Sequence, residues 1–177
     1  MPPRGIPAMP PRGIRAVPPR GIPVTVEAEV AAPPASAFAA IAPIALENIF
    51  RGFGPLPAVT RTREQTGGWD HVGATRVVEL GDGSEARERL TAYEPPTYFG
   101  YRLSGFTGLL RHVVSHADGE WWFSDRGPGG THVRWTYIFQ PRAGRRALVR
   151  VAIAPLWRRY QQRALMLAVD EAANAVA

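Results

Sequence analysis

Two neighbouring segments, residues 119–125 and 131–140, constrain the fold more than any other feature of the chain. Read as strands joined at "RGPGG", they place alternate side chains on opposite faces, because successive residues of a strand point to opposite sides. One face is apolar and largely aromatic: Trp121, Phe123, Val133, Trp135, Tyr137 and Phe139. The other face of the second strand is polar, and Trp122 falls on the outer parity of the first, exposed or covered by a loop. The pair therefore predicts an antiparallel sheet with one buried aromatic face.

Further strand-like segments precede this pair, at 24–30, 58–65, 73–80, 84–93 and 98–106. Each is bounded by turn residues such as "GDG" and "EPP". Two short helices are expected after the first strand, at 32–42 and 43–50, because prolines open each segment and apolar spacing continues it. The order predicts an α+β fold with a curved antiparallel sheet of about seven strands.

The last segment, 144–176, has the period of an amphipathic helix. Its apolar side recurs every three to four residues: Leu148, Ala152, Leu156, Tyr160, Ala164 and Leu167. Pro155 is expected to kink the helix or to mark the start of its second half. An Arg-rich helix of this kind with Trp157 also suits a membrane surface. A helix packed on the predicted sheet explains the same pattern with fewer assumptions, and a space between the two is a natural ligand pocket.

This order of segments resembles a known group of proteins. The segments "PPASAFAAIA", "WDHVGATRVVELGDGS", "RERLTAYEPPTYFGYRL" and "GEWWF…GGTHVRWTYIF" are similar to the START-like, or SRPBCC, superfamily and its helix-grip fold. Within it, the chain looks like the polyketide cyclase/dehydrase and lipid-transport group, over about residues 24–176. The resemblance implies a fold and a pocket, not a reaction, because the superfamily includes cyclases, lipid carriers, hormone receptors and co-chaperones.

Strand parity also predicts a polar pair among the inward residues. In 84–93, Glu88 shares the inner face with Ala86, Leu90 and Ala92, and a carboxylate on an apolar face is costly unless it is paired. Arg76 has the matching parity in 73–80 and is the expected partner. The pair is read either as a structural ion pair or as a contact for a ligand.

The aromatic face has two readings as well. A single ring fits a filled core as well as it fits the wall of a cavity. The rings taken together suit a cavity for a planar, partly oxygenated apolar molecule. In 98–104, Phe99, Tyr101 and Leu103 point inward and Arg102 outward. The predicted ligand-binding residues are Arg76, Glu88, Tyr101, Trp121, Phe123, Trp135 and Tyr137. The segment "GFGPLP" (52–57), beside Phe50 and Phe53, is the expected lid.

Residues 1–23 form a separate part of the predicted organisation, with 24–177 as the ligand-binding domain. "PPRGI" occurs three times there with a period of eight residues, too short for a solenoid unit. The segment reads as a disordered or extended arm. It holds +4 of the net charge of +6, so the remaining chain is nearly balanced. The arm is either a basic tether for an acidic surface or a duplicated segment without a role.

Several kinds of chemistry find little support. The chain has no Cys, which excludes disulfides, thiolate metal sites and a Cys nucleophile. His112 and His116 stand four apart but no HExxH motif accompanies them, so no metal site is predicted, and neither a cofactor nor nucleic acid is expected. His112 remains a possible acid or base at the pocket mouth. The chain shows neither a secretory signal nor a membrane span, and a cytoplasmic location is the default.

The first functional hypothesis is a carrier of a small hydrophobic, aromatic or polyketide-like ligand. The alternative is a polyketide aromatase/cyclase or dehydrase, with Arg76 orienting a carbonyl, Glu88 or His112 moving protons and Tyr101 or Tyr137 donating a hydrogen bond. A second alternative is an interaction protein that acts through the basic arm. The residues leave open whether a reaction is catalysed, and also the oligomeric state.

Overall fold

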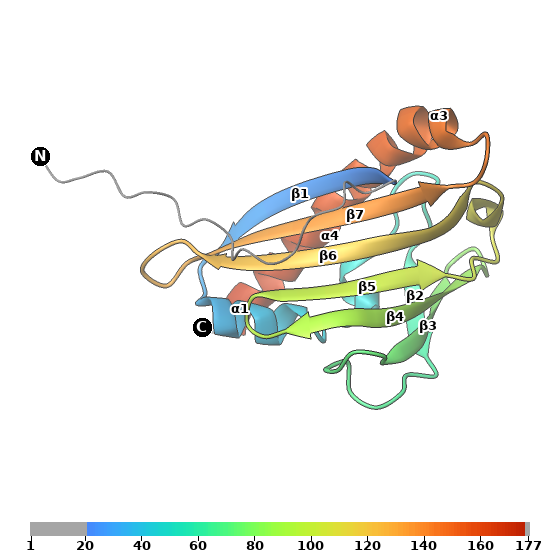
Figure 1. Ribbon diagram of the computed structural model, residues 1–177. Coiled ribbons are helices and arrows are strands. Elements are labelled where there is room, and N and C mark those ends of the chain that lie inside the picture. The colour runs from blue at the N-terminus through green and yellow to red at the C-terminus, as the bar shows by residue number, and fades with distance from the viewer. Residues whose placement is uncertain (1–20, 176–177) are drawn as a thin grey trace, which may run out of the picture.

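Seven strands form one antiparallel sheet in the order β1-β7-β6-β5-β4-β3-β2 (Figure 1). The computed structural model describes residues 21–175. The strands are β1 (Ile22–Val30), β2 (Val59–Arg63), β3 (Thr75–Leu80), β4 (Glu85–Glu94), β5 (Tyr98–Ser104), β6 (Val114–Asp125) and β7 (Thr131–Pro141). The helical segments are α1 (Pro34–Ile41), α2 (Leu46–Ile49), η1 (Leu109–His112), α3 (Arg146–Leu148), η2 (Val149–Ile153) and α4 (Ala154–Asn174). The predicted curved sheet with a long C-terminal helix is confirmed.

The helix α4 covers one face of the sheet and lies behind β1, β7 and β6 in Figure 1. Its small buried residues Ala164, Ala168 and Ala172 allow it to approach the sheet closely. Gln161 is fully buried there, and its amide Nε2 donates a hydrogen bond of 3.0 Å to the Trp135 carbonyl. The helix is therefore fixed to the middle of β7 by a polar contact inside an apolar core.

The C-terminal helix is interrupted where Pro155 predicts. A π-helical turn, η2, leads into α4 without a break, and Pro155 lies in the first turn of α4. The prediction of which residues face the sheet is wrong at the beginning of this helical segment, because Leu148 and Ala152 are exposed. The wider π turn shifts the phase of the helix, so that a four-residue spacing does not stay on one face across it.

Two other predictions differ from the structure in detail. The strand β1 begins at Ile22, the last residue of the third "PPRGI" copy, rather than at Val24. Residues 1–20 of the predicted arm lie outside the described residues. In β4 the register with β5 shifts between Leu90 and Ala92. Because of the bulge, Ala92 is not on the inner face as predicted. Tyr93 lies opposite the inward Phe99 and packs on Phe38.

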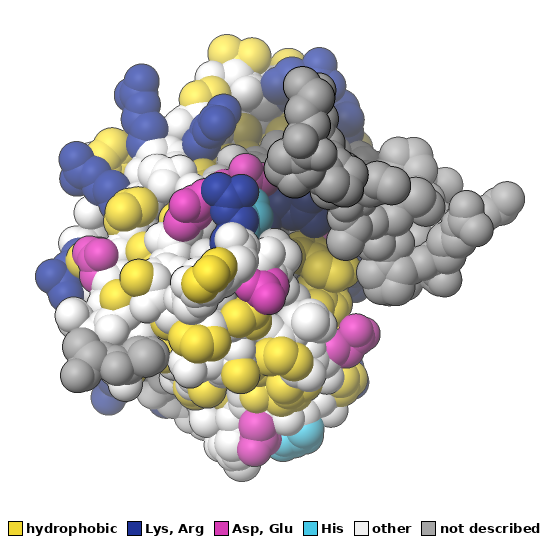
Figure 2. Space-filling model, turned by 90° about the vertical axis from the view of Figure 1, so that its left-hand side faces the viewer, with side chains coloured by type: hydrophobic (Ala, Val, Ile, Leu, Met, Phe, Trp, Pro, Cys, Tyr) yellow, Lys and Arg dark blue, Asp and Glu magenta, His cyan; other side chains and the backbone are white. Residues whose placement is uncertain are grey.

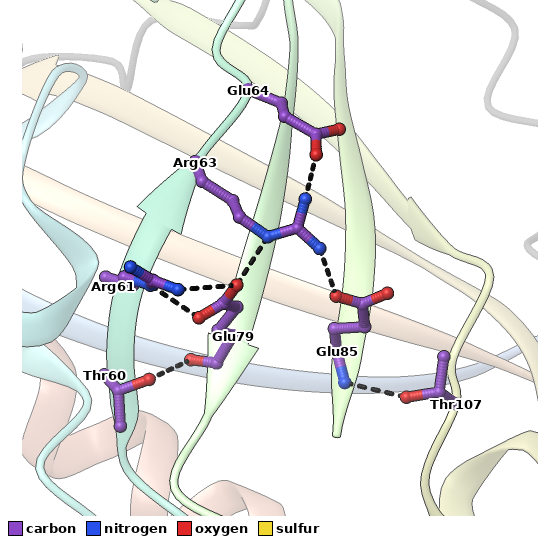
Figure 3. Close-up of polar contacts among 7 residues, drawn as sticks. All are labelled: Thr60, Arg61, Arg63, Glu64, Glu79, Glu85 and Thr107. Carbon is purple, nitrogen blue, oxygen red and sulfur yellow. Dashed lines mark hydrogen bonds and ion pairs between the residues drawn. The ribbon is translucent and has the colours of Figure 1, made fainter. Parts of the chain in front are cut away.

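The outer face of the sheet is polar and tied by ion pairs. Arg63 of β2 contacts Glu79 of β3 and Glu85 of β4, which joins the three strands at this edge (Figure 3). The Glu85 backbone N–H also donates to the Thr107 hydroxyl at 2.9 Å and holds the segment before η1. Trp122 lies on this face, half-buried against Tyr98 with ring centroids 4.2 Å apart. Within residues 21–175, no helix is long and apolar enough to cross a membrane.

Candidate functional site

A cavity of about 410 Å³ lies between the inner face of the sheet, α2, the 52–57 segment and the beginning of α4. Its wall is mostly apolar, with contributions from β3 to β7. The exposed members of the wall mark its opening: Pro55, Asp82, Leu109 and Ala152. The curved sheet and the helix therefore enclose a space that their side chains do not fill.

Stacked rings form the deep part of the wall. Trp121 and Trp135 stack with centroids 4.3 Å apart, and Tyr137 packs on Trp157 at 4.6 Å. The Trp135 indole N–H donates a hydrogen bond of 3.1 Å to the Tyr101 hydroxyl. The deep wall of the cavity therefore combines aromatic rings with phenol hydroxyl groups.

Six of the seven predicted residues line this cavity, and Phe123 does not. Phe123 lies in the core beside it, edge-on to Phe38 at 5.2 Å and stacked with Phe99 at 6.1 Å. Strand parity places a ring on the inner face but does not show whether another element covers it. Here α1 brings Phe38 over this end of the sheet and fills the space.

Gly119 explains why the Tyr101 ring lies where it does. Tyr101 and Gly119 are paired residues on β5 and β6. A Cβ atom at Gly119 would overlap the ring of Tyr101. The missing side chain thus lets the ring lie across β6 as part of the cavity wall.

Arg76 and Glu88 form the predicted pair directly opposite each other on β3 and β4. Arg76 Nε donates to Glu88 Oε2 at 2.5 Å, and the side chains are only 5% and 3% exposed. The guanidinium also lies 3.9 Å from the ring centroid of Trp69. The ring face and the carboxylate together compensate the charge of the buried arginine.

Trp69 is a cavity residue that the sequence pattern does not reveal. It lies in the loop "TGGWDH" between β2 and β3, is 5% exposed and lines the cavity. A loop residue has no parity with which to predict its direction. The available signal is a single large aromatic residue in an otherwise small and polar loop.

The ion pair keeps free hydrogen-bonding capacity toward the cavity. Within the described part of the chain, neither the terminal nitrogens of Arg76 nor Oε1 of Glu88 has a hydrogen-bond partner. Both residues line the cavity. The pair thus offers a donor fork and an acceptor to a ligand's polar group.

The two cavity tyrosines are neutral hydroxyl groups at ordinary pH. Burial, followed by the charge of Glu88, raises the pKa of Tyr101 far above its usual value. Burial also raises the pKa of Tyr137, with further contributions from Tyr101 and Glu88. Each hydroxyl therefore acts as a hydrogen-bond donor or acceptor rather than as a base.

His112 is not brought to this polar group. Its side chain is exposed on η1, accepts a hydrogen bond of 3.0 Å from Arg111 and is not part of the cavity wall. His116 is on β6, 3.9 Å from Asp118. Residues 21–175 contain no group of three side chains suited to a metal ion.

One hydroxyl from α4 holds both ends of the 52–57 segment. The Tyr160 hydroxyl accepts a hydrogen bond from the Gly52 N–H at 3.0 Å and donates one to the Pro57 carbonyl at 2.9 Å. Pro55, Leu56 and Pro57 line the cavity. The 52–57 segment is therefore part of the cavity wall and is tied to the long helix, and its movement as a lid stays a prediction.

Comparison with solved structures places this fold among known proteins. The aromatase/cyclase Zhui from Streptomyces sp. R1128 is 19% identical with a TM-score of 0.67, covering 88% of this chain and 96% of that one. Ara h 8.0201 is 15% identical with a TM-score of 0.63, covering 88% and 97%. Norcoclaurine synthase from Thalictrum flavum is 15% identical with a TM-score of 0.59, covering 85% and 96%. At these identities the likeness is one of fold.

No curated protein matches the chain. The family model described as polyketide cyclase/dehydrase and lipid transport matches residues 22–172, which is most of the sequence and includes every strand and the cavity. This membership supports a role in binding a hydrophobic ligand or in polyketide cyclisation. The chain belongs to the polyketide cyclase/dehydrase and lipid-transport family of the START-like superfamily.

Proposed function

We propose that this protein binds and carries a small apolar molecule, aromatic or polyketide-like, in the cavity between the sheet and α4. The observation that carries the proposal is the cavity wall, in which the stacked Trp121 and Trp135 stand beside the Arg76–Glu88 pair. Flat rings bind the body of a planar ligand, and a few polar groups fix its orientation. The Trp157 indole N–H is a further candidate donor, because it is buried and has no partner among residues 21–175.

The test is native mass spectrometry of the protein purified from its host, followed by denaturation and identification of the released molecule. Ala86 lines the cavity, so Ala86→Leu fills it, whereas Ala39→Leu makes the same change on the exposed side of α1. An apolar molecule is expected with the unmodified protein and with Ala39→Leu, but not with Ala86→Leu. An empty protein that also fails to bind an apolar fluorescent probe would contradict the proposal.

A cyclase or dehydrase that uses the same cavity is the second candidate. The free hydrogen-bonding capacity of the buried Arg76–Glu88 pair favours it. Glu88 would take a proton from a carbon between two carbonyl groups, and that carbon would then attack another carbonyl of the same chain. Arg76 would stabilise the oxygen that gains negative charge, and Tyr101 or Tyr137 would donate a hydrogen bond to it. The proton held by Glu88 would then pass to that oxygen.

Glu88→Gln separates the two candidates. A carrier with this substitution still releases its ligand unchanged, with an altered affinity. An enzyme binds a reactive polycarbonyl chain but no longer returns it cyclised, as mass spectrometry of the products would show. Conversion at an unchanged rate would remove Glu88 from the proposed chemistry.

A further inference from the structure

Two segments beside the cavity opening carry only basic charge. Residues 105–113 and 141–153 contain five arginines and neither Asp nor Glu: Arg111, Arg142, Arg145, Arg146 and Arg150. The segments lie side by side, because the Arg142 N–H donates to the Val113 carbonyl at 2.9 Å and Arg142 Nε donates to the Arg111 carbonyl at 2.6 Å. Both segments contribute to the cavity wall, so this basic surface adjoins the opening.

Two of these arginines keep their charge free for a partner. Arg145 and Arg150 are exposed and have no ion-pair partner within the described residues. Across the opening, Glu85 is paired with Arg63 at 2.6 Å and Asp82 accepts hydrogen bonds from Ser84. The other end of the molecule differs, because Asp and Glu side chains are spread there among hydrophobic and Arg side chains (Figure 2).

Apolar side chains protrude from the same two segments. Leu109 is 88% exposed, Val151 75% and Leu148 44%. They are three of the five large hydrophobic residues that residues 21–175 expose, so most of these gather at this end. Leu109 also lines the cavity, which connects the protruding group with the interior.

We propose that this surface, formed by 105–113 and 141–153, docks on an anionic lipid bilayer. The arginines contact the headgroups, while Leu109, Leu148 and Val151 enter the boundary of the acyl region. The apolar side chains protrude singly from short helical turns. A protein partner would need a separate pocket for each of them, whereas a bilayer accepts them at any spacing. An opening that faces the bilayer lets an apolar ligand enter without crossing water.

The full chain is tested by flotation with vesicles of phosphatidylcholine alone or mixed with phosphatidylglycerol. Arg145→Glu with Arg150→Glu reverses charge at the surface, and Leu109→Ser with Val151→Ser removes apolar area. The matched controls are Arg87→Glu with Arg89→Glu on the exposed side of β4, and Met166→Ser on α4. Binding only to anionic vesicles is expected, reduced roughly tenfold or more in both surface variants and unchanged in the controls.

A site-specific probe reports insertion directly. The chain has no Cys, so Leu109→Cys labelled with an environment-sensitive fluorophore gives a unique signal. Its emission is expected to shift to the blue with anionic vesicles, while the same label at Met166→Cys does not respond. The variant with Arg145→Glu and Arg150→Glu is expected to keep its affinity for an apolar probe, because neither residue lines the cavity. Failure of docking is thereby distinguished from failure of the proposed ligand binding.

Three outcomes would overturn the proposal. One is an unmodified protein that does not bind anionic vesicles at low salt. Another is vesicle binding that both surface variants retain, which would assign it to the basic residues of 1–20. The third is vesicle binding that is lost only on charge reversal, with no response of the Leu109 label, which would indicate electrostatic adsorption without the proposed insertion of the apolar side chains.

Discussion

Arg76 and Glu88 stabilise each other only as long as both are present. Taking either charge out of water is expensive, and the pair is compensated by one short contact and the Trp69 ring. An exposed pair of the same type stands on the outer face, where Arg102 contacts Asp118 at 2.6 Å with half of its side chain in solvent. The two pairs share a chemistry and differ in burial.

Arg76→Met should therefore lower the free energy of unfolding by about 3–5 kcal/mol, because it leaves a buried carboxylate without a partner. Combining it with Glu88→Leu should recover most of that loss. Arg102→Met should cost less than about 1 kcal/mol. Urea unfolding measures all three, and equal losses at Arg76 and Arg102 would contradict this account of the buried pair.

Gly119 and Gly100 offer the same substitution on opposite faces of the sheet. Alanine at Gly119 meets the ring of Tyr101, and alanine at Gly100 meets the Tyr98 hydroxyl at 2.8 Å. Gly119→Ala should cost about 1–3 kcal/mol of stability through overpacking, and Gly100→Ala should cost less, because it meets only the end of the half-buried Tyr98 side chain. Only Gly119→Ala should also weaken the binding of an apolar fluorescent probe, because it drives the Tyr101 ring into the cavity. Equal probe affinities in the two variants would contradict that role.

At the scale of elements, the 52–57 segment depends on one hydroxyl of α4. Tyr160→Phe removes both hydrogen bonds that hold its ends. Hydrogen exchange at Gly52 should become faster, and an apolar probe should leave the cavity faster, with about 1–3 kcal/mol lost in stability. The control is Tyr93→Phe, because the Tyr93 hydroxyl makes no hydrogen bond with residues 21–175 that this change could remove. Unchanged probe kinetics in Tyr160→Phe would show that the segment does not gate the cavity.

Strand parity predicted most of the site because each strand has one face against the helix. Arg76, Glu88 and the inward rings follow directly from a period of two residues. The bulge in β4 and the π turn before Pro155 were not predictable, because each inserts backbone that changes the period locally. Phe123 was predicted to line the cavity, but Phe38 of α1 covers it. Trp69 lines the cavity but was not predicted, because it lies in a loop without periodicity.

At the scale of the whole molecule, all five tyrosines have a raised pKa: Tyr93, Tyr98, Tyr101, Tyr137 and Tyr160. Burial is the main cause at each, and at Tyr98 burial with nearby Glu120, Glu94 and Asp118 raises the pKa to about 12. The folded state therefore favours the protonated form of each tyrosine over the phenolate. An unfolded chain would release these protons near pH 10.

Stability should accordingly be independent of tyrosine ionisation below about pH 10 and fall as the pH rises above it, because the unfolded state then binds fewer protons. Phenolate absorbance at about 295 nm should appear together with the loss of the circular dichroism signal. In guanidinium the same absorbance should rise near pH 10. Phenolate formation near pH 10 in a chain that keeps its native spectrum would contradict the burial of these side chains.

The order of the sheet has a consequence for the chain as it is made. β1 lies at the edge and pairs with β7, with Val30 opposite Thr131, and α4 packs over β1. The strand β1 is made before its partners and must wait for β7 and α4. During that wait its apolar residues have no native partner, so the core of this fold is complete only after α4 has been made.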